Sequence, residues 1–529
     1  MRKEFPYLLI IMIAEELLRR TVGLHDSVME QHDTVGHLSS ESHLVGDDYH
    51  RHSAVGEFLD DVKDLSDHHG IQSRCRFIEE HDIRIHCKST RYCHTLLLSS
   101  GELHRIRIRL IGKTDPLQKL IRFLRSLLLG HDLQFNRMQN GEVVRLSEEG
   151  AALFDFYGNP LPMCFENREK ELFEDREEGV DDMLSEIRSI PASLRLGFEK
   201  FPKEELRAFL KEGFKEMLVL GCGSAYHAGL VFCEAMREVA EVCVRAEIAS
   251  EFLTEKPCVG EGTLVIVVSQ SGETADTLLA VERAKKCGAK ILSVCNARAS
   301  SLTRLSDFSL ITRCGRERAV AATKSYVSQA QYLLLICLEY ADITGKTNVD
   351  EVARLRREIS LLSQKTESIC RAEKRLEEVA LGLKNAEAVF FLGRKGDLAA
   401  AKEGSLKLKE VSYLFSEAYP SGELKHGTLA LMEKGVWCVV VATDPSLLQK
   451  NAATLSEVLC RGASAVVITA GSALEEAPAD YVVTVPEADP VVSPLFSAVV
   501  MQYFAYFAAK ARGCDVDKPR NLAKSVTVE

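Results

Sequence analysis

Apolar and polar positions divide the chain into an irregular first part and a regular second part. From about residue 205 to 515, short apolar runs alternate with helical segments. The predicted strands are Met217–Leu220, Thr263–Val268, Lys290–Asn296, Ala388–Leu392, Trp437–Thr443, Ala465–Thr469 and Tyr481–Val485. Strands this apolar are buried on both faces, as in parallel sheets covered by helices. We therefore predict an α/β fold with two tandem doubly wound units, each built on a mostly parallel sheet.

Two similar turns introduce these units. Leu220 to Gly223 and Leu392 to Gly396 each end a predicted strand and begin a helix. A recurrence of this kind is consistent with an internal duplication.

Residues 1 to about 135 differ in composition from the remainder. Thirteen of the fifteen histidines lie at or before His131. The segment has no sustained helical or strand periodicity, so we assign it no fold and interpret it as disordered or foreign to the rest of the chain. Pairs such as His50/His52 and His68/His69 have no further ligands at the spacing of a metal site, so we predict none.

An intermediate region separates this segment from the two α/β units. Gly141–Leu146 and Ala152–Asp155 predict two short strands. Residues 165 to 190 are strongly charged and favour a solvated helix or linker. The expected organisation is 1–135 unassigned, 136–165 the short strands, 166–204 a charged linker, 205–350 the first α/β domain, 375–515 the second, and 516–529 a C-terminal tail.

The composition limits the class of protein. With 529 residues, 46% of them hydrophobic and 27% charged, the chain is long enough for several globular domains. A net charge of −11 argues against nucleic acid or a membrane surface as a partner. The apolar run Tyr7–Ala14 is too short to span a bilayer and lacks a cleavage pattern, so we expect no targeting segment. Sixteen cysteines without CxxC spacing favour reduced thiols and a cytoplasmic location.

The segment richest in candidate chemistry is Ser269–Thr277, which follows an apolar strand. Hydroxyls and backbone N–H groups meet there at a helix N-terminus, and the helix dipole favours an anion such as phosphate. The alternative is a capping box in which Ser271 and Thr274 satisfy the N–H groups of the helix itself. The loop Gly221–Ser224 lacks the third glycine of a dinucleotide fingerprint, which is therefore excluded.

A second candidate lies on the predicted helix Ala399–Glu410. Glu403, Lys407 and Glu410 fall at i, i+4 and i+7 and share one face. One interpretation is a solvated Glu–Lys pair. If the face lines a pocket, a carboxylate becomes a candidate general base for proton transfer next to a carbonyl.

Two more residues complete the candidates. His426 lies on the glycine-flanked loop Gly422–Gly427. Histidine exchanges protons near neutral pH, which suits the opening of a cyclic sugar, but a surface position is the alternative. Lys524 lies in the polar tail Val516–Glu529; such a tail frays by default, whereas a docked lysine is able to form an imine.

Four motifs in order resemble the glutamine:fructose-6-phosphate aminotransferase (isomerizing) family, the glucosamine-6-phosphate synthases. They are Ser269–Thr274, Glu403–Glu410, Gly422–Gly427 and Lys518–Glu529. The resemblance runs from about 205 to 529 and implies two sugar isomerase (SIS) domains. It also implies that residues 139–160 are a remnant of a glutaminase domain.

The resemblance assigns roles by position. Residues implied to hold the substrate, fructose 6-phosphate, are Ser269, Gln270, Ser271, Thr274, Ser224, Glu403 and Ala523. Lys524 forms the imine with the open-chain ketose, His426 assists ring opening, and Glu410 moves the proton between C1 and C2, supported by Lys407 and Glu403. Ammonia then displaces the lysine. The family uses no metal or organic cofactor, and its histidine enters from the neighbouring subunit, which implies a homodimer.

The chain also departs from the family pattern. Members begin Met-Cys-Gly and use that cysteine as the glutaminase nucleophile, whereas this chain begins Met1-Arg2-Lys3 and has no cysteine before Cys75. We therefore expect ammonia to supply the nitrogen, with glutamine doubtful as a donor.

Substitutions occur in the isomerase half as well. Ala225 and Ala322 stand where the family has serine, and Thr428 replaces a proline. Each lost hydroxyl removes about 0.5–1.5 kcal/mol of binding, which weakens sugar affinity. The alternatives to an active enzyme are a non-catalytic sugar-phosphate-binding protein and an inactive truncated fragment.

Overall fold

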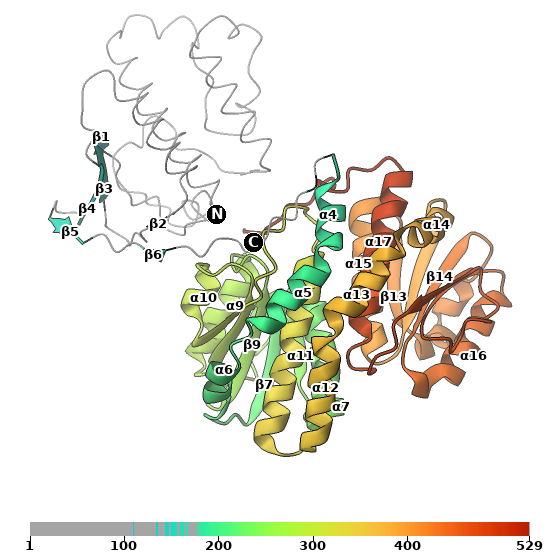
Figure 1. Ribbon diagram of the computed structural model, residues 1–529, viewed down its shortest axis with the longest axis horizontal. Helices are drawn as coiled ribbons and strands as arrows, with labels where there is room; N and C mark the ends of the chain where they lie inside the picture. The colour runs from blue at the N-terminus through green and yellow to red at the C-terminus, as the bar shows by residue number, and fades with distance from the viewer. Residues whose placement is uncertain are drawn as a thin grey trace, which may run out of the picture. The chain divides into compact units, whose positions relative to one another are not determined.

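The computed structural model describes residues 109–110, 134–135, 143–147, 150–155, 159–162, 166–167, 177 and 179–527 (Figure 1). The chain divides into two compact units, Met1–Lys170 and Glu171–Glu529. Apart from a few short strands, the expectations about residues 1–135 lie outside the described residues.

The described strands of the first unit form a small sheet and a separate pair. The sheet has the order β1-β3-β4-β5. Its strands are β1 (Arg109–Leu110), β3 (Val143–Ser147), β4 (Gly150–Phe154) and β5 (Pro160–Leu161), and β2 (Gln134–Phe135) pairs with β6 (Glu166–Asn167). The two short strands predicted from the sequence are confirmed as the antiparallel pair β3–β4.

The second unit contains a first parallel sheet of order β11-β10-β9-β7-β8. Its strands are β7 (Glu216–Gly221), β8 (Arg245–Ile248), β9 (Thr263–Ser269), β10 (Lys290–Cys295) and β11 (Phe308–Ile311). Every residue of β9 is buried, because helices cover both faces. The edge strands β8 and β11 are partly exposed and carry no continuous apolar run, so the hydrophobic pattern did not predict them.

A second parallel sheet follows, of order β13-β12-β14-β15-β16. Its strands are β12 (Ala388–Gly393), β13 (Ser416–Pro420), β14 (Val436–Ala442), β15 (Ser464–Ala470) and β16 (Tyr481–Val485). The two sheets have the same strand order, with β7 matching β12 and β9 matching β14. The predicted fold class, two tandem doubly wound parallel sheets, is confirmed.

The two units also turn alike after their first strands. Gly223, before α7 (Ser224–Ala240), has φ 55° and ψ −126°, and Lys395, before α15 (Gly396–Ser412), has φ 50° and ψ −128°. Lysine rarely adopts a positive φ, so this shared backbone conformation supports the duplication inferred from sequence.

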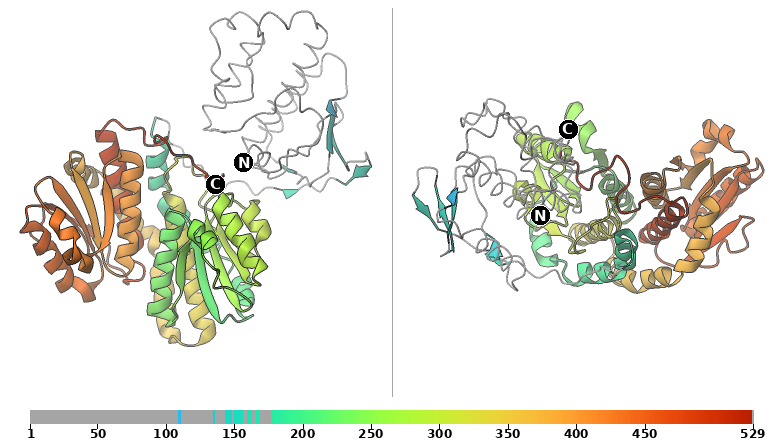
Figure 2. Two further views of the ribbon diagram at one scale, coloured as in Figure 1. Left: turned by 180° about the vertical axis from the view of Figure 1, so that it is seen from behind. Right: turned by 90° about the horizontal axis from the view of Figure 1, so that it is seen from above.

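One hydrophobic core joins the inner faces of both sheets (Figure 2). Alternate residues of each strand face it, such as Ile266 of β9 and Val439 of β14. The helices that contribute include α7, α11 (Lys324–Thr344), α12 (Val349–Ser360), α13 (Leu362–Arg371), α14 (Glu373–Leu383), α15 and α17 (Pro494–Ala511). The outer faces have cores of their own, beneath α8 (Ala249–Thr254), α9 (Ala275–Lys286) and α10 (Ser301–Leu305) on one sheet and α16 (Leu448–Leu459) on the other.

The end of the expected charged linker, 166–204, is packed rather than solvated. It forms α4 (Asp182–Arg188), α5 (Ile190–Glu199) and the start of α6 (Lys203–Leu210), and Met183, Ile187 and Ile190 are fully buried. Apolar residues recur here every three or four positions, which places them on one helical face despite the surrounding charges. The expectation of a solvated segment over residues 165–190 is therefore wrong for α4.

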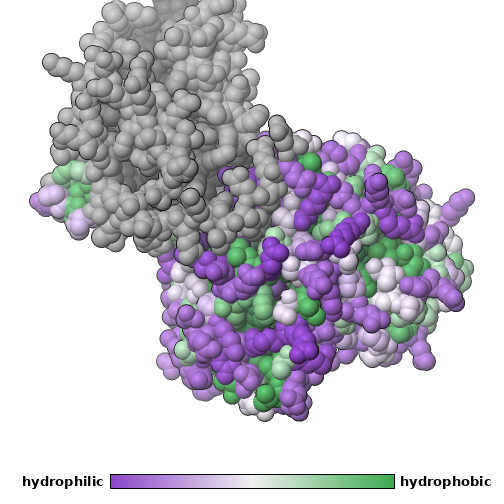
Figure 3. All heavy atoms as spheres, viewed as in Figure 1, coloured by the Kyte–Doolittle hydropathy of each residue, from purple (hydrophilic) through white to green (hydrophobic). Residues whose placement is uncertain are grey.

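The surface and the thiols complete the description. Figure 3 shows a mostly hydrophilic face over the described part of the second unit, with scattered apolar residues. Among the described residues, no helix is both long enough and apolar enough to cross a membrane. The cysteines of residues 179–527 are free thiols.

Gly404 lets α15 and α17 approach closely. A Cβ at this position would lie 2.3 Å from Sδ and 3.0 Å from Cβ of Met501. Gly404→Val is therefore expected to lower the free energy of unfolding by roughly 1–3 kcal/mol through overpacking, measured by guanidinium denaturation. Lys409→Val, at an exposed position of the same helix, is the matched control and should cost less than about 1 kcal/mol. Equal stability of both variants would contradict the close approach.

Candidate active site

The Ser269–Thr274 loop connects β9 to α9 and is held in one shape. The hydroxyl of Ser269 accepts the Gly272 N–H at 3.0 Å, and that of Ser271 accepts the Glu273 N–H at 3.1 Å. Gly272 has φ +67°, and a Cβ there would lie 2.2 Å from Ser300 Oγ, so only glycine fits.

The helix after this loop has no capping box. Thr274 is the N-cap of α9 but makes no side-chain cap hydrogen bond, and the Ser271 bond goes to an N–H that precedes the helix. The loop therefore presents its hydroxyls at the positive end of a helix dipole, the arrangement that suits an anion. Gln270 accepts the Asn296 N–H with its backbone carbonyl, which fixes the loop against the end of β10.

Glu403, Lys407 and Glu410 of α15 form one ionic cluster, called here the carboxylate cluster. Lys407 Nζ lies 2.5 Å from Glu410 Oε2 and 3.5 Å from Glu403 Oε1. The side chains of Glu403 and Lys407 are 0% and 1% exposed, and that of Glu410 is 21% exposed. The interpretation as a solvated pair is therefore wrong. Burial disfavours the ammonium of Lys407, but Glu410 and Glu403 outweigh it and raise the pKa of Lys407.

Helix α7 of the first α/β domain contacts this cluster. Ser224 Oγ donates to Glu403 Oε1 at 2.8 Å, and His227 Nδ1 lies 2.8 Å from Glu403 Oε2. Helix α7, which begins after β7 of the first sheet, thus contacts the buried carboxylate cluster beside the second sheet. His227 was not among the sequence candidates, although its place one turn after Ser224 on a helix that begins at a strand end was a usable signal.

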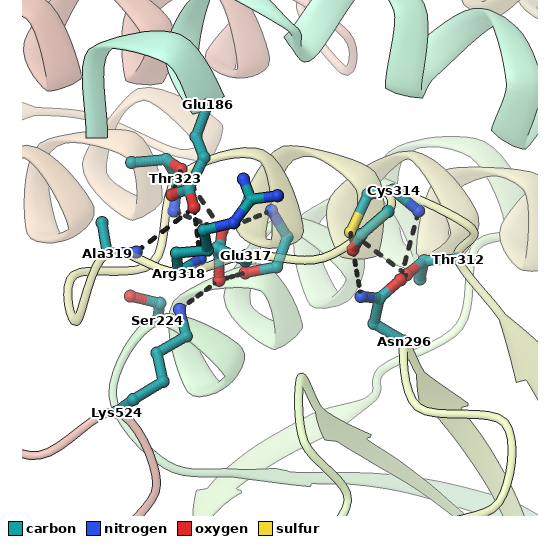
Figure 4. Close-up of polar contacts among 12 residues, drawn as sticks. Glu186, Ser224, Asn296, Thr312, Cys314, Glu317, Arg318, Ala319, Thr323 and Lys524 are labelled. Atoms are coloured by element: carbon teal, nitrogen blue, oxygen red, sulfur yellow. Dashed lines mark hydrogen bonds and ion pairs between the residues drawn. The ribbon is translucent and has the colours of Figure 1, made fainter. Parts of the chain in front are cut away.

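A second ionic group, called here the tail cluster, contains Glu186, Glu317, Thr323 and Lys524 (Figure 4). Lys524 Nζ lies 2.5 Å from Glu317 Oε2. Glu317 is fully buried in the loop before α11 and also accepts the Thr323 N–H at 2.9 Å. Glu186, on α4, accepts the Ala319 N–H at 3.2 Å, and its Oε2 lies 3.3 Å from the Thr323 hydroxyl oxygen.

The two buried carboxyls of the tail cluster shift in opposite directions. Burial first, then the neighbouring charge of Glu317, raise the pKa of Glu186 to about 8, although Lys524, Arg318 and Lys324 oppose this. Burial also disfavours ionisation of Glu317, but Lys524 and the N–H groups of Thr323 and Ser325 lower its pKa to about 2. One carboxyl is therefore neutral and the other charged near neutral pH. Sequence alone gave no signal for Glu317 or Glu186, because their partners are far along the chain.

Other candidates lie away from these contacts. His426 is exposed at the end of the 3-10 helix η5 (Ser421–His426), and within residues 179–527 no hydrogen bond links it to either ionic cluster. Ala523 is exposed beside Lys524. Ala225, Ala322 and Thr428 are partly buried. No group of three or more metal-type ligands lies together in the described part of the chain.

Comparisons with known proteins agree with this geometry. A model of the SIS domain matches residues 214–337 and 382–511, one match on each sheet. The chain is 37% identical over 413 residues to the glutamine–fructose-6-phosphate aminotransferase (isomerizing) of Clostridium tetani, which covers 76% of this chain and 68% of that protein. The chain belongs to the glutamine–fructose-6-phosphate aminotransferase family.

Further relatives fit the same family and fold. The aminotransferase of the same name from Caldanaerobacter subterraneus is 42% identical over 319 residues, covering 60% of this chain and 52% of that protein. Among solved structures, the C-terminal domain of glucosamine-fructose-6-phosphate aminotransferase from Francisella tularensis aligns with a TM-score of 0.62 and 30% identity, over 65% of this chain and all of that one. A glucosamine-6-phosphate deaminase from Thermotoga maritima aligns with a TM-score of 0.53 and 25% identity, over 65% and 99% of the two chains. The resemblance stated from the motifs is confirmed.

Glu186 makes stability depend on pH. Its pKa is about 8 in the folded chain against a usual 4.5, so between these values the folded state binds more protons than the unfolded state. Stability due to this group is therefore complete at low pH and lost as pH rises toward 8. We expect the free energy of unfolding to fall between about pH 6 and 8, by on the order of 1 kcal/mol per pH unit, in urea titrations.

Glu186→Gln is the control for this prediction, because it keeps the shape of the side chain and cannot ionise. The decline above pH 6 should be smaller in this variant. Asp397, whose pKa burial raises to about 6, adds to the decline near pH 6 in both proteins, so the difference between them reports Glu186. An identical decline in both proteins would exclude Glu186 as its source.

Proposed function

We propose that the chain converts fructose 6-phosphate to glucosamine 6-phosphate, the committed amination of amino-sugar biosynthesis. The observation that carries the proposal is the contact of Ser224 and His227 from the first SIS domain with buried Glu403 of the second. This contact joins the helix that follows β7 of the first domain to a carboxylate–lysine cluster suited to proton transfer, as aminotransfer with isomerization requires. The loop proposed to bind phosphate, Ser269–Thr274, follows β9, which pairs with β7 in the same sheet. The activity that the relatives' names state supports the same reaction.

Substrate binding is proposed to begin at the phosphate. The residues assigned to the phosphate and the sugar are Ser269, Gln270, Ser271, Thr274, Ser224, Glu403 and Ala523. Helix α9 supplies N–H groups and the positive end of its dipole, which together favour a dianionic phosphate over solvent. Ala225 and Ala322 lack the two hydroxyls that serine supplies at these positions in the family. We therefore expect a raised KM for the sugar phosphate.

The chemical steps follow from the groups around the sugar. The neutral amine of Lys524 attacks C2 of the open-chain ketose, the carbonyl oxygen leaves as water, and an imine remains. Ammonia then adds at C2 and Lys524 leaves as the amine. Glu410 removes a proton from C1 and returns one to C2, while the C1 hydroxyl gives up its proton to the C2 nitrogen and C1 becomes the aldehyde carbon. Lys407 at 2.5 Å balances the charge of Glu410.

The source of the ammonia depends on residues 1–135 rather than on the two SIS domains. The expectation that glutamine fails as a donor falls on residues 1–135, outside the described residues. We propose that ammonia is the species that reaches the imine, and the assay below compares free ammonium with glutamine. The cytoplasm, with its reducing conditions and sugar-phosphate pool, is the proposed location and suits the free cysteines.

Purified chain is expected to form glucosamine 6-phosphate from fructose 6-phosphate with ammonium, monitored by product mass. Lys524→Ala should abolish formation, and Glu410→Gln should lower kcat by about 10²–10⁴, the usual value of a general base. Lys409→Ala, an exposed lysine on the same helix, is the matched control and should keep activity. Binding of the sugar phosphate without turnover would favour the alternative of a non-catalytic binding protein, which the substitutions Ala225 and Ala322 motivate.

His426 gives a test of the proposed homodimer. It is exposed in the single chain, so we propose that it completes the site of a neighbouring subunit. Inactive Lys524→Ala and His426→Asn chains, mixed and reassociated, should regain about a quarter of wild-type activity, because half of the dimers are mixed and each has one intact site. If both residues served the same subunit, the mixture would stay inactive.

A further inference from the structure

Lys524 is held by a carboxylate whose other partners are all fixed. Glu317 accepts the Ser325 N–H at 3.0 Å and the Ser325 hydroxyl at 2.7 Å, in addition to the Thr323 N–H at 2.9 Å. Its side chain is fully buried, while that of Lys524 is 25% exposed. The Glu317 carboxylate is thus a rigid part of the first SIS domain, whereas Lys524 belongs to the C-terminal tail.

The number of hydrogens available between Glu186, Thr323 and Glu317 indicates that Glu186 is protonated. The single hydroxyl of Thr323 lies 3.3 Å from Glu186 Oε2 and 3.2 Å from Glu317 Oε1. One hydroxyl hydrogen serves only one of two carboxylates. Both contacts are satisfied if Glu186 carries a proton, donates it to Thr323 Oγ1, and Thr323 donates to Glu317.

The rest of the C-terminal tail is tied to the same elements. The carboxylate of Asp517 accepts the N–H groups of Asp182 and Met183 at the start of α4, at 2.9 and 2.8 Å. Val320, in the loop between Glu317 and Thr323, donates its N–H to the Asp517 carbonyl at 3.0 Å. Beyond Lys524, the Val526 carbonyl accepts the Ala275 N–H at 3.1 Å, in the first turn of α9. Lys524 therefore lies between the attachments at Asp517 and Val526, and Arg520 adds another by donating its N–H to the Tyr413 hydroxyl at 2.8 Å.

We propose that Glu317 is a positioning residue for Lys524, and that with Thr323 and a protonated Glu186 it forms a docking site that holds the Lys524 ammonium beside the sugar pocket until substrate enters. The role of Lys524 in catalysis rests on the proposed function, but the docking itself does not. An ammonium has no free electron pair, so the docked lysine is unreactive toward carbonyls. Because Glu186 is neutral, Glu317 carries the one negative charge of the carboxyl pair, and the docked ammonium lies 2.5 Å from it.

The two amide variants separate this proposal from a merely structural ion pair. In Glu317→Gln, the amide oxygen keeps the two backbone N–H groups at Oε1, while the amide nitrogen replaces Oε2 and cannot accept from Lys524. In Glu186→Gln, the amide nitrogen donates to Thr323 as the protonated acid does, and the oxygen keeps the N–H groups of Arg318 and Ala319. The first variant should release Lys524 and the second should retain it.

The test is the rate of reductive methylation of Lys524 by formaldehyde and cyanoborohydride, in the full chain, read by mass spectrometry of the C-terminal peptide. Lys425, an exposed lysine on the second SIS domain, is the internal reference. Glu317→Gln should raise the Lys524 rate about tenfold, the effect of losing one charge-assisted hydrogen bond, and should accelerate tryptic cleavage after Arg520 and Lys524. Glu186→Gln should stay within about twofold of wild type on the same scale.

A matched control tests whether replacing any buried carboxylate loosens the fold enough to expose Lys524. Glu339→Gln changes another fully buried carboxylate, this one on α11 and paired with Arg207 and Arg356 rather than with the tail, and should leave the Lys524 rate unchanged. Equal Lys524 rates in wild type and Glu317→Gln would overturn the docking site. A Glu186→Gln rate as high as that of Glu317→Gln would overturn the protonated relay.

Activity measured in parallel keeps this proposal distinct from the proposed function. If ammonium supports turnover, Glu317→Gln should lower kcat about tenfold while KM for fructose 6-phosphate changes less than about twofold, because the lysine and not the sugar is misplaced. If the wild-type chain makes no product, the proposed function fails, and the methylation contrast still decides the docking site.

Discussion

Burial of the Glu403 carboxylate is the constraint on which the arrangement of the second unit depends. A carboxylate taken out of water is tolerated only with full hydrogen bonding and a compensating charge. Lys407 supplies the charge from the same helix, but Ser224 and His227 come from the other SIS domain. The two domains therefore satisfy Glu403 only when α7 faces α15, and this packing brings the start of α7 to the carboxylate cluster.

The duplicated domains use equivalent positions for different purposes. After β9, the first domain has the Ser269–Thr274 loop, whose helix lacks a side-chain cap. After the matching strand β14, Thr443 instead binds Asp397 of the same domain through its N–H at 2.8 Å and its hydroxyl at 2.5 Å. The second domain thus fills with its own carboxylate the place where the first has room for an anion. In the proposed function, the first copy binds phosphate and the second contributes acid–base groups.

The C-terminal tail connects these parts to α4. Asp517 binds N–H groups at the start of α4, Lys524 pairs with Glu317, and the Val526 carbonyl accepts an N–H in the first turn of α9. One segment of about ten residues therefore contacts α4, the buried carboxyl pair and the helix that follows the anion loop. Glu186 lies on α4 and Glu317 in the loop before α11, and Thr323 joins them. A change at any one of these contacts is therefore felt by the lysine that the proposed reaction uses.

The sequence by itself determined the fold class and most of the central strands, because fully buried parallel strands carry continuous apolar runs such as Leu264–Val268. It also determined that Glu403, Lys407 and Glu410 share a face, since helical spacing is a local property. Only the tertiary structure decided that this face is buried and that His227, Glu186 and Glu317 belong to the site. The edge strands β8 and β11 and the burial of α4 were likewise invisible to local patterns. These features depend on partners distant in sequence, Lys524 being 207 residues from Glu317, and no local periodicity encodes such pairings.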